Sequence, residues 1–157
     1  MPAPYTGQCL CGDVRYRVSA EPLTVYVCHC TDCQRRTGSA FALSMLVRRS
    51  SLEIIQGEPG SYLAHLPDGR TKSGRMCSAC GTRLWGEPAN QAVVVVQPGT
   101  LEQPVQLRPV AHQWTRSAQP WVIFPPDAVL YESQPADPRE LVRLWKAAHD
   151  QESGDAT

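Results

Sequence analysis

The seven cysteines of this 157-residue chain lie in three short clusters, and their spacing constrains the fold more than any other feature. The clusters are Cys9-x-Cys11, Cys28-x-Cys30-x-x-Cys33 and Cys77-x-x-Cys80, and Gly81 follows the last one. One grouping uses every thiol: a four-sulfur site of Cys9, Cys11, Cys77 and Cys80, and a three-sulfur site of Cys28, Cys30 and Cys33. Thiolates at such spacings are common zinc ligands. The sequence therefore predicts two zinc ions per chain.

The two predicted sites differ in their number of ligands, and this difference predicts different roles. Four thiolates complete a tetrahedral shell, which is typical of a structural zinc. Three thiolates leave one coordination position for water or substrate, which is typical of a catalytic zinc. One alternative is a second structural zinc with a fourth ligand from His65, His112 or Asp32. For the four-sulfur set the alternatives are disulfides or buried free thiols, although an odd number of cysteines leaves one thiol over.

Length and composition are those of one small globular domain. The chain has 14 prolines and 11 glycines, which favours short elements joined by turns. No apolar run reaches the roughly 20 residues that a membrane-spanning helix needs, and the first residues lack the pattern of a signal peptide. We therefore expect a cytoplasmic protein that does not enter the membrane, in which clustered cysteines bind metal rather than form disulfides.

The charge pattern argues against nucleic acid as a partner. The formal net charge is zero at pH 7, whereas nucleic-acid-binding proteins are commonly basic. Arginine is nevertheless in large excess over lysine, and arginine suits recognition of a carboxylate. Because Arg35 and Arg36 follow Cys33 closely, we expect one of them to bind a substrate carboxylate, the alternative being a solvated pair of surface charges. Three further residues are expected either to line a pocket or to pack in the core, namely His112, Trp114 and Trp121.

Alternating hydrophobic positions predict several short strands. Residues 13–18 alternate apolar and basic side chains, and a run of four valines predicts a strand that is buried on both faces. Within 24–30, His29 falls on the opposite face from Cys28 and Cys30, which makes it a poor candidate for the missing ligand. The expected strands are residues 13–18, 24–30, 40–47, 52–56, 61–66, 92–97, 105–114 and 121–124.

Two helices are also expected. A short helix covers residues 31–37 and stops at Gly38. A longer helix starts at Asp137, with Pro138 in the first turn and Glu140 completing a capping box. Its apolar stripe consists of Leu141, Leu144, Trp145 and Ala148.

These elements predict a simple domain organisation. Residues 1–135 form one zinc-binding domain, and the C-terminal helix at 136–150 packs on the same domain. Residues 151–157 are polar and are expected to be a disordered tail. The sequence does not define an oligomeric state.

Several segments resemble one known family. The first three are Gly7-Gln-Cys9-Leu-Cys11-Gly12, Cys28-His-Cys30-Thr-Asp-Cys33-Gln-Arg-Arg-Thr-Gly38-Ser and Arg75-Met-Cys77-Ser-Ala-Cys80-Gly81-Thr. With the later segments Pro109-Val-Ala-His112 and Pro120-Trp121, they resemble the glutathione-dependent formaldehyde-activating enzyme and centromere protein V family. The resemblance runs from about Gly7 to Trp121.

The resemblance implies a mainly β structure, namely a β-tent fold of small antiparallel sheets around a structural zinc. It implies a structural zinc on Cys9, Cys11, Cys77 and Cys80, and a catalytic zinc on Cys28, Cys30 and Cys33. It also implies carbon–sulfur lyase chemistry, in which formaldehyde and glutathione join to give S-hydroxymethylglutathione. The expected partners are therefore a small-molecule thiol such as glutathione and an aldehyde, and a thiolate-rich site favours a sulfur ligand.

Two other functions stay open on the sequence alone. One is a non-enzymatic zinc-binding module for protein or nucleic-acid interaction, which the excess of arginine favours slightly. The other is storage of zinc at a labile three-sulfur site. Salt-dependent binding to DNA separates the first from an enzyme, and the zinc affinity of the three-sulfur site separates the second.

Overall fold

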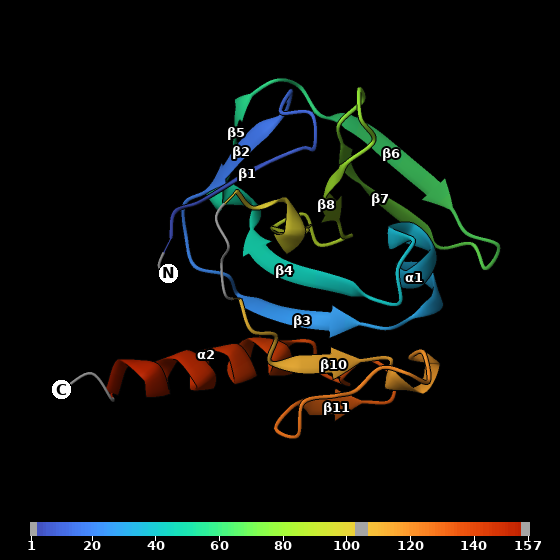
Figure 1. Ribbon diagram of the computed structural model, residues 1–157, viewed down its shortest axis with the longest axis vertical. Coiled ribbons are helices and arrows are strands. Elements are labelled where there is room, and N and C mark those ends of the chain that lie inside the picture. The colour runs from blue at the N-terminus through green and yellow to red at the C-terminus, as the bar shows by residue number, and fades with distance from the viewer. Residues whose placement is uncertain (1–2, 103–106, 155–157) are drawn as a thin grey trace. The chain divides into compact units, whose positions relative to one another are not determined.

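The computed structural model describes residues 3–102 and 107–154, which fold into two compact units (Figure 1). Unit 1 comprises Met1–Pro22 and Met45–Gln106, and unit 2 comprises Leu23–Ser44 and Leu107–Thr157. Each unit is thus assembled from two separate stretches of chain. Across the described residues, more of the chain lies in strands than in helices, so the predicted mainly β fold with a C-terminal helix is confirmed.

Unit 1 contains antiparallel sheets, as expected from the family resemblance. The smaller sheet has the order β1-β2-β5 and consists of Tyr5–Gln8, Arg15–Val18 and Leu52–Gln56. In the larger sheet β4 pairs with β9, and β8, β7 and β6 follow in that order. Their bounds are β4 Ala42–Arg48, β9 Val93–Val96, β8 Arg83–Glu87, β7 Thr71–Met76 and β6 Gly60–His65. Strand β4 begins in unit 2, and the part from Met45 to Arg48 pairs with β9.

The core of unit 1 comes from alternate positions on these strands. Val94 and Val96 are completely buried, whereas Val93 and Val95 are only half-buried. The expectation that the four-valine strand is buried on both faces is therefore wrong for one face. Apolar side chains that leave water contribute about 1.5–3 kcal/mol each, so the alternation suffices to fix the inward face of β9.

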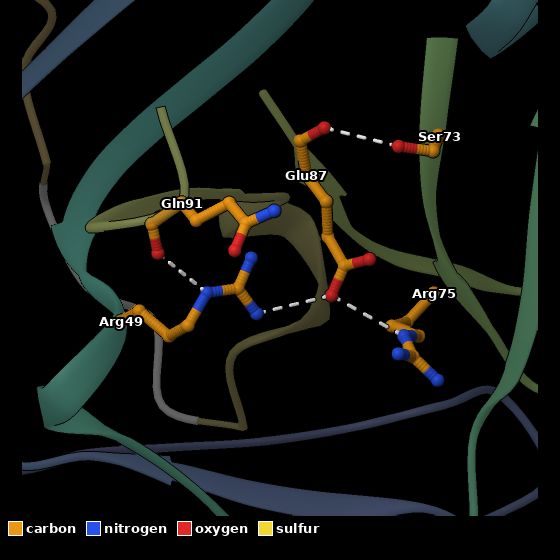
Figure 2. Close-up of polar contacts among 5 residues, drawn as sticks. All are labelled: Arg49, Ser73, Arg75, Glu87 and Gln91. Carbon is orange, nitrogen blue, oxygen red and sulfur yellow. Dashed lines mark hydrogen bonds and ion pairs between the residues drawn. The ribbon is translucent and has the colours of Figure 1, made fainter. Parts of the chain in front are cut away.

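An arginine–glutamate cluster connects three elements of unit 1 (Figure 2). Glu87 on β8 accepts hydrogen bonds from Arg49 at 3.1 Å and from Arg75 on β7 at 3.3 Å. Arg49 lies in the 3-10 turn η1 (Arg49–Ser51) and also donates to the carbonyl of Gln91. Burial opposes ionisation of Glu87, but the two arginines outweigh it and lower its pKa. The cluster thereby braces the β7–β8 hairpin, which carries the second half of the four-cysteine set.

Replacing Gly57 with alanine is expected to destabilise unit 1 by about 2–4 kcal/mol. Gly57 has a φ of 72°, and a Cβ built there overlaps the backbone carbonyl oxygen of Asp13. Gly69 is the matched control, because its φ is 85° but no atom lies within 4 Å of its Cβ position. Gly69→Ala should cost only the strain of about 1–2 kcal/mol. Urea unfolding measures both, and equal losses would contradict the overlap at Gly57.

In unit 2 three strands of the eight-stranded sheet pair in the order β11-β10-β3, and both pairings are parallel. The strands are β3 (Thr24–Cys28), β10 (Ala111–Gln113) and β11 (Val129–Tyr131). Long connections between them allow each strand to return in the same direction. The strand expected at 105–114 is shorter than predicted, and residues 105–106 lie outside the described part. The strand expected at 121–124 does not form, and prolines at both sides of this segment cannot donate ladder hydrogen bonds.

Both expected helices are present in unit 2. Helix α1 (Thr31–Thr37) ends at Gly38, as predicted. Helix α2 (Arg139–Gly154) begins after Asp137, whose carboxylate accepts a hydrogen bond from the Arg139 amide at 3.0 Å. It buries Leu141 and Trp145 and contacts β3.

The outer limits of α2 differ from the predicted helix at 136–150. The helix starts and ends later, and residues 155–157 lie outside the described part of the chain. The described helices include none with the length and apolarity to cross a bilayer. The division of the chain into a domain, a packed helix and a disordered tail stays a prediction.

Candidate metal centres

The four cysteines of the first predicted site meet in unit 1. The sulfurs of Cys9, Cys11, Cys77 and Cys80 all lie within 4.8 Å of one another. The Cys9 and Cys11 sulfurs are 3.5 Å apart, and the Cys11 and Cys77 sulfurs are 3.7 Å apart. Four sulfurs bonded tetrahedrally to one zinc at about 2.3 Å are separated by about 3.8 Å. The observed spacing therefore fits a single four-sulfur zinc site.

Two tight turns position these sulfurs. In the second turn, the Gly81 amide donates to the Cys77 carbonyl at 2.9 Å, and the Cys77 amide donates to the Thr82 carbonyl at 2.9 Å. The Thr82 hydroxyl accepts from the Leu10 amide and lies 3.1 Å from the Cys80 sulfur. This hydroxyl thus connects the two halves of the set. Its hydrogen bond, with that of the Thr82 amide, lowers the pKa of Cys80 to about 5.

The three remaining cysteines meet in unit 2, at the corner between β3 and α1. Cys28 ends the strand, Cys30 is the N-cap of the helix, and Cys33 lies in its first turn. Their sulfurs also lie within 4.8 Å of one another. The Cys30 sulfur accepts a hydrogen bond from the Cys33 amide at 3.4 Å. Hydrogen bonds from Cys28 and Cys33 lower the pKa of Cys30, and the bond to Cys30 raises the pKa of Cys28.

Within residues 3–102 and 107–154, no histidine, aspartate or glutamate joins this three-sulfur group. The candidates for a fourth ligand, His65, His112 and Asp32, are all outside it. His112 instead hydrogen-bonds to His29 through nitrogens 3.0 Å apart, and the two rings stack. Burial lowers the pKa of both histidines, so both are neutral at neutral pH. The His29 ring contacts His112 and does not join the three sulfurs, which agrees with the face that the sequence predicts for it.

The two arginines next to the cluster behave differently. The Arg36 guanidinium donates to the Cys33 sulfur at 3.6 Å and is half-buried. Arg35 is exposed. A guanidinium beside thiolates reduces their mutual repulsion. Arg36 thus already forms a hydrogen bond to one of the three cysteines of this group.

Sequence reasoning missed the polar residues that hold this corner in place. Gln34 donates to the backbone carbonyls of His29 and Ser117, each at 2.8 Å. Of the aromatic candidates, Trp114 packs against the cysteine cluster, whereas Trp121 is 68% exposed. No local pattern marks Gln34 or Ser117, because the hydrogen bonds of Ser117 with Gln34 and His29 join residues more than 80 positions apart.

Residues 4–117 match the family model described as glutathione-dependent formaldehyde-activating enzyme. The chain belongs to this family. The matched range includes every cysteine of both sets, so the geometry above is that of a glutathione-dependent formaldehyde-activating family member.

Two individual proteins are similar to this family member. A Halomonas elongata protein, provisionally named a glutathione-dependent formaldehyde-activating enzyme, is 32% identical over 83 residues, which are 50% of this chain and 53% of that protein. The chain thus spans about half the length of this curated relative. A crystal structure of a Rhodobacter sphaeroides protein superposes with a TM-score of 0.50 at 24% identity, covering 64% of this chain and 91% of that chain. At this identity the likeness shows a shared fold alone.

Proposed function

We propose that this protein is a zinc-dependent enzyme that joins a small thiol to an aldehyde and releases them again, a carbon–sulfur lyase activity. The family points to glutathione and formaldehyde as the two substrates. The observation that carries the proposal is the difference between the two cysteine sets. One offers four sulfurs, and the other offers three with no further ligand among the described residues. A three-sulfur site has room for a fourth, exchangeable ligand.

The donor sets support two different zinc sites. Cys9, Cys11, Cys77 and Cys80 would hold a structural zinc, and Cys28, Cys30 and Cys33 a catalytic one. When bound, the catalytic zinc would favour the thiolate form of an added thiol. Three thiolates also make the site soft, which favours a fourth sulfur over oxygen. All seven cysteines are free thiols, and we propose that the protein works in the cytoplasm, where reducing conditions keep them so.

The reaction is an addition in which no atom is lost. The thiol gives up its proton, and its sulfur forms a bond to the aldehyde carbon. The π electron pair of the carbonyl moves to the oxygen, which takes up a proton. The product is a hemithioacetal, and the reverse reaction breaks the same carbon–sulfur bond. Arg36 would offset the negative charge that collects at Cys33 and its neighbours.

Cobalt(II) in place of zinc tests this proposal without turnover. Each sulfur ligand adds sulfur-to-cobalt charge-transfer absorption, so titration with glutathione should increase this absorption in the wild-type protein. Cys30→Ser should show no increase, because its three-sulfur set is broken. The four-cysteine set contributes the same background to both proteins. A wild-type spectrum that does not respond to glutathione in large excess would overturn the proposal.

A further inference from the structure

Trp114 adopts a backbone conformation that large side chains rarely adopt. Its φ is 60° and its ψ is 38°, which is the left-handed region. Residues with a Cβ are strained there, and such strain persists only where surrounding contacts hold it. The Trp114 amide donates to the Ser133 carbonyl at 2.9 Å, and the Trp114 carbonyl accepts from the Ser117 amide at 3.1 Å. Hydrogen bonds at both the amide and the carbonyl of Trp114 therefore hold the strained turn in place.

A polar network attaches this turn to the three-cysteine corner. The turn continues as η3 (Thr115–Ser117). The Ser117 hydroxyl donates to the His29 carbonyl at 3.1 Å, and Gln34 donates to the carbonyls of both residues. Gln119 donates in turn to the Gln34 side-chain oxygen at 2.9 Å. Since His29 lies between two of the cysteines, the network fixes the turn relative to their sulfurs.

The turn carries an aromatic ring next to the cysteines and a cation that lies over this ring. The Trp114 ring packs against the buried cluster of Cys28, Cys33 and Ala42. The Arg116 guanidinium lies over this ring, with its central carbon 4.7 Å from the ring centroid. Arg116 is exposed and, in the part of the chain that the structure describes, has no carboxylate partner. A cation–π contact fixes the guanidinium while leaving its N–H groups free to bind a ligand.

We propose that Arg116, held over Trp114, determines substrate specificity by binding a carboxylate of the thiol. The inference rests on the proposed function and assigns the carboxylate to Arg116 in place of Arg35 or Arg36. Arg36 is engaged by the Cys33 sulfur, whereas the Arg116 fork is free to pair with both oxygens of a carboxylate. The preferred substrates are thus thiols that carry a carboxylate, and neutral thiols bind at the same sulfur site without this contact.

Thiol binding to the cobalt-loaded 157-residue protein tests the role of Arg116. The two probes are glutathione, which carries carboxylates, and 2-mercaptoethanol, which is neutral. Arg116→Gln should raise the Kd of glutathione by about tenfold, the loss expected for a charge-assisted pair. The Kd of 2-mercaptoethanol should stay within about twofold, because that thiol makes no contact with the guanidinium.

Arg108→Gln is the matched control in the same unit. Arg108 is exposed and binds Asp127 at 2.6 Å, so its loss removes the same charge away from the proposed contact. It should leave both Kd values unchanged. Equal weakening of both thiols by Arg116→Gln, or unchanged binding of glutathione, would overturn the role of Arg116 with the thiol site intact. A wild-type protein that responds to neither thiol would instead overturn the proposed function, and this inference with it.

Discussion

Replacing Cys77 with alanine is expected to unfold unit 1 and leave the protein insoluble. Cys77 is 1% exposed, and its sulfur lies 3.7 Å from that of Cys11, which is 66 residues away in the sequence. A structural zinc contributes about 10–16 kcal/mol in small zinc domains. A whole domain is stable by only about 5–15 kcal/mol. The free energy of folding lost with the proposed zinc is therefore larger than the stability that the remaining contacts of unit 1 provide. Circular dichroism and the yield of soluble protein measure the result.

Cys30→Ala is the matched control for this experiment. It makes the same chemical change in the other cysteine set, where the side chain is half-buried. Unit 1 should stay folded in this variant and retain one zinc per chain. A soluble Cys77→Ala protein with the thermal stability of the wild type would contradict a structural zinc at the four-cysteine set.

Cys30→Ser should lower the rate of adduct formation from glutathione and formaldehyde by about 100-fold or more, to near the uncatalysed rate. Serine replaces a soft sulfur ligand with a hard oxygen, which a three-sulfur zinc site does not favour. The fold should survive, because Cys30 caps α1 by accepting from the Cys33 amide and serine is a preferred N-cap residue. The rate is measured by nuclear magnetic resonance of the hemithioacetal under initial conditions.

Two measurements keep this result interpretable. The thermal unfolding of Cys30→Ser should match the wild type, and its metal content should fall from two zinc ions per chain towards one. A variant that has lost this zinc but still forms the adduct at the wild-type rate would show that the three-cysteine set is not the site of reaction.

The sequence predicts the features that depend on short-range spacing. The grouping of cysteines followed from counting thiols, and the sulfurs do meet in these two groups. Helix α1 and its end at Gly38 followed from local capping preferences. The alternation at residues 13–18 predicted β2, although the strand begins two residues later at Arg15.

Features that depend on distant parts of the chain could not be predicted in this way. The parallel pairing of β10 with β3 joins His112 to Val27, and no local pattern specifies that partner. The same is true of Arg116, whose importance depends on the left-handed turn at Trp114 and on the network around Gln34. A single exposed arginine carries no signal in sequence until the fold places it over an aromatic ring beside the cysteines.

The two units also differ in when they can be completed during synthesis. All four cysteines of unit 1 have been made once Cys80 is added, when strands β8 and β9 and the 3-10 turn at Pro98–Thr100 are still missing. The cysteines of unit 2 are made much earlier, but β10, the Trp114 turn and α2 all come from the second stretch of that unit. The first set would therefore be able to bind the proposed zinc before synthesis of the chain ends. The second set lacks the neighbouring Trp114 side chain until about 80 more residues have been added after Cys33.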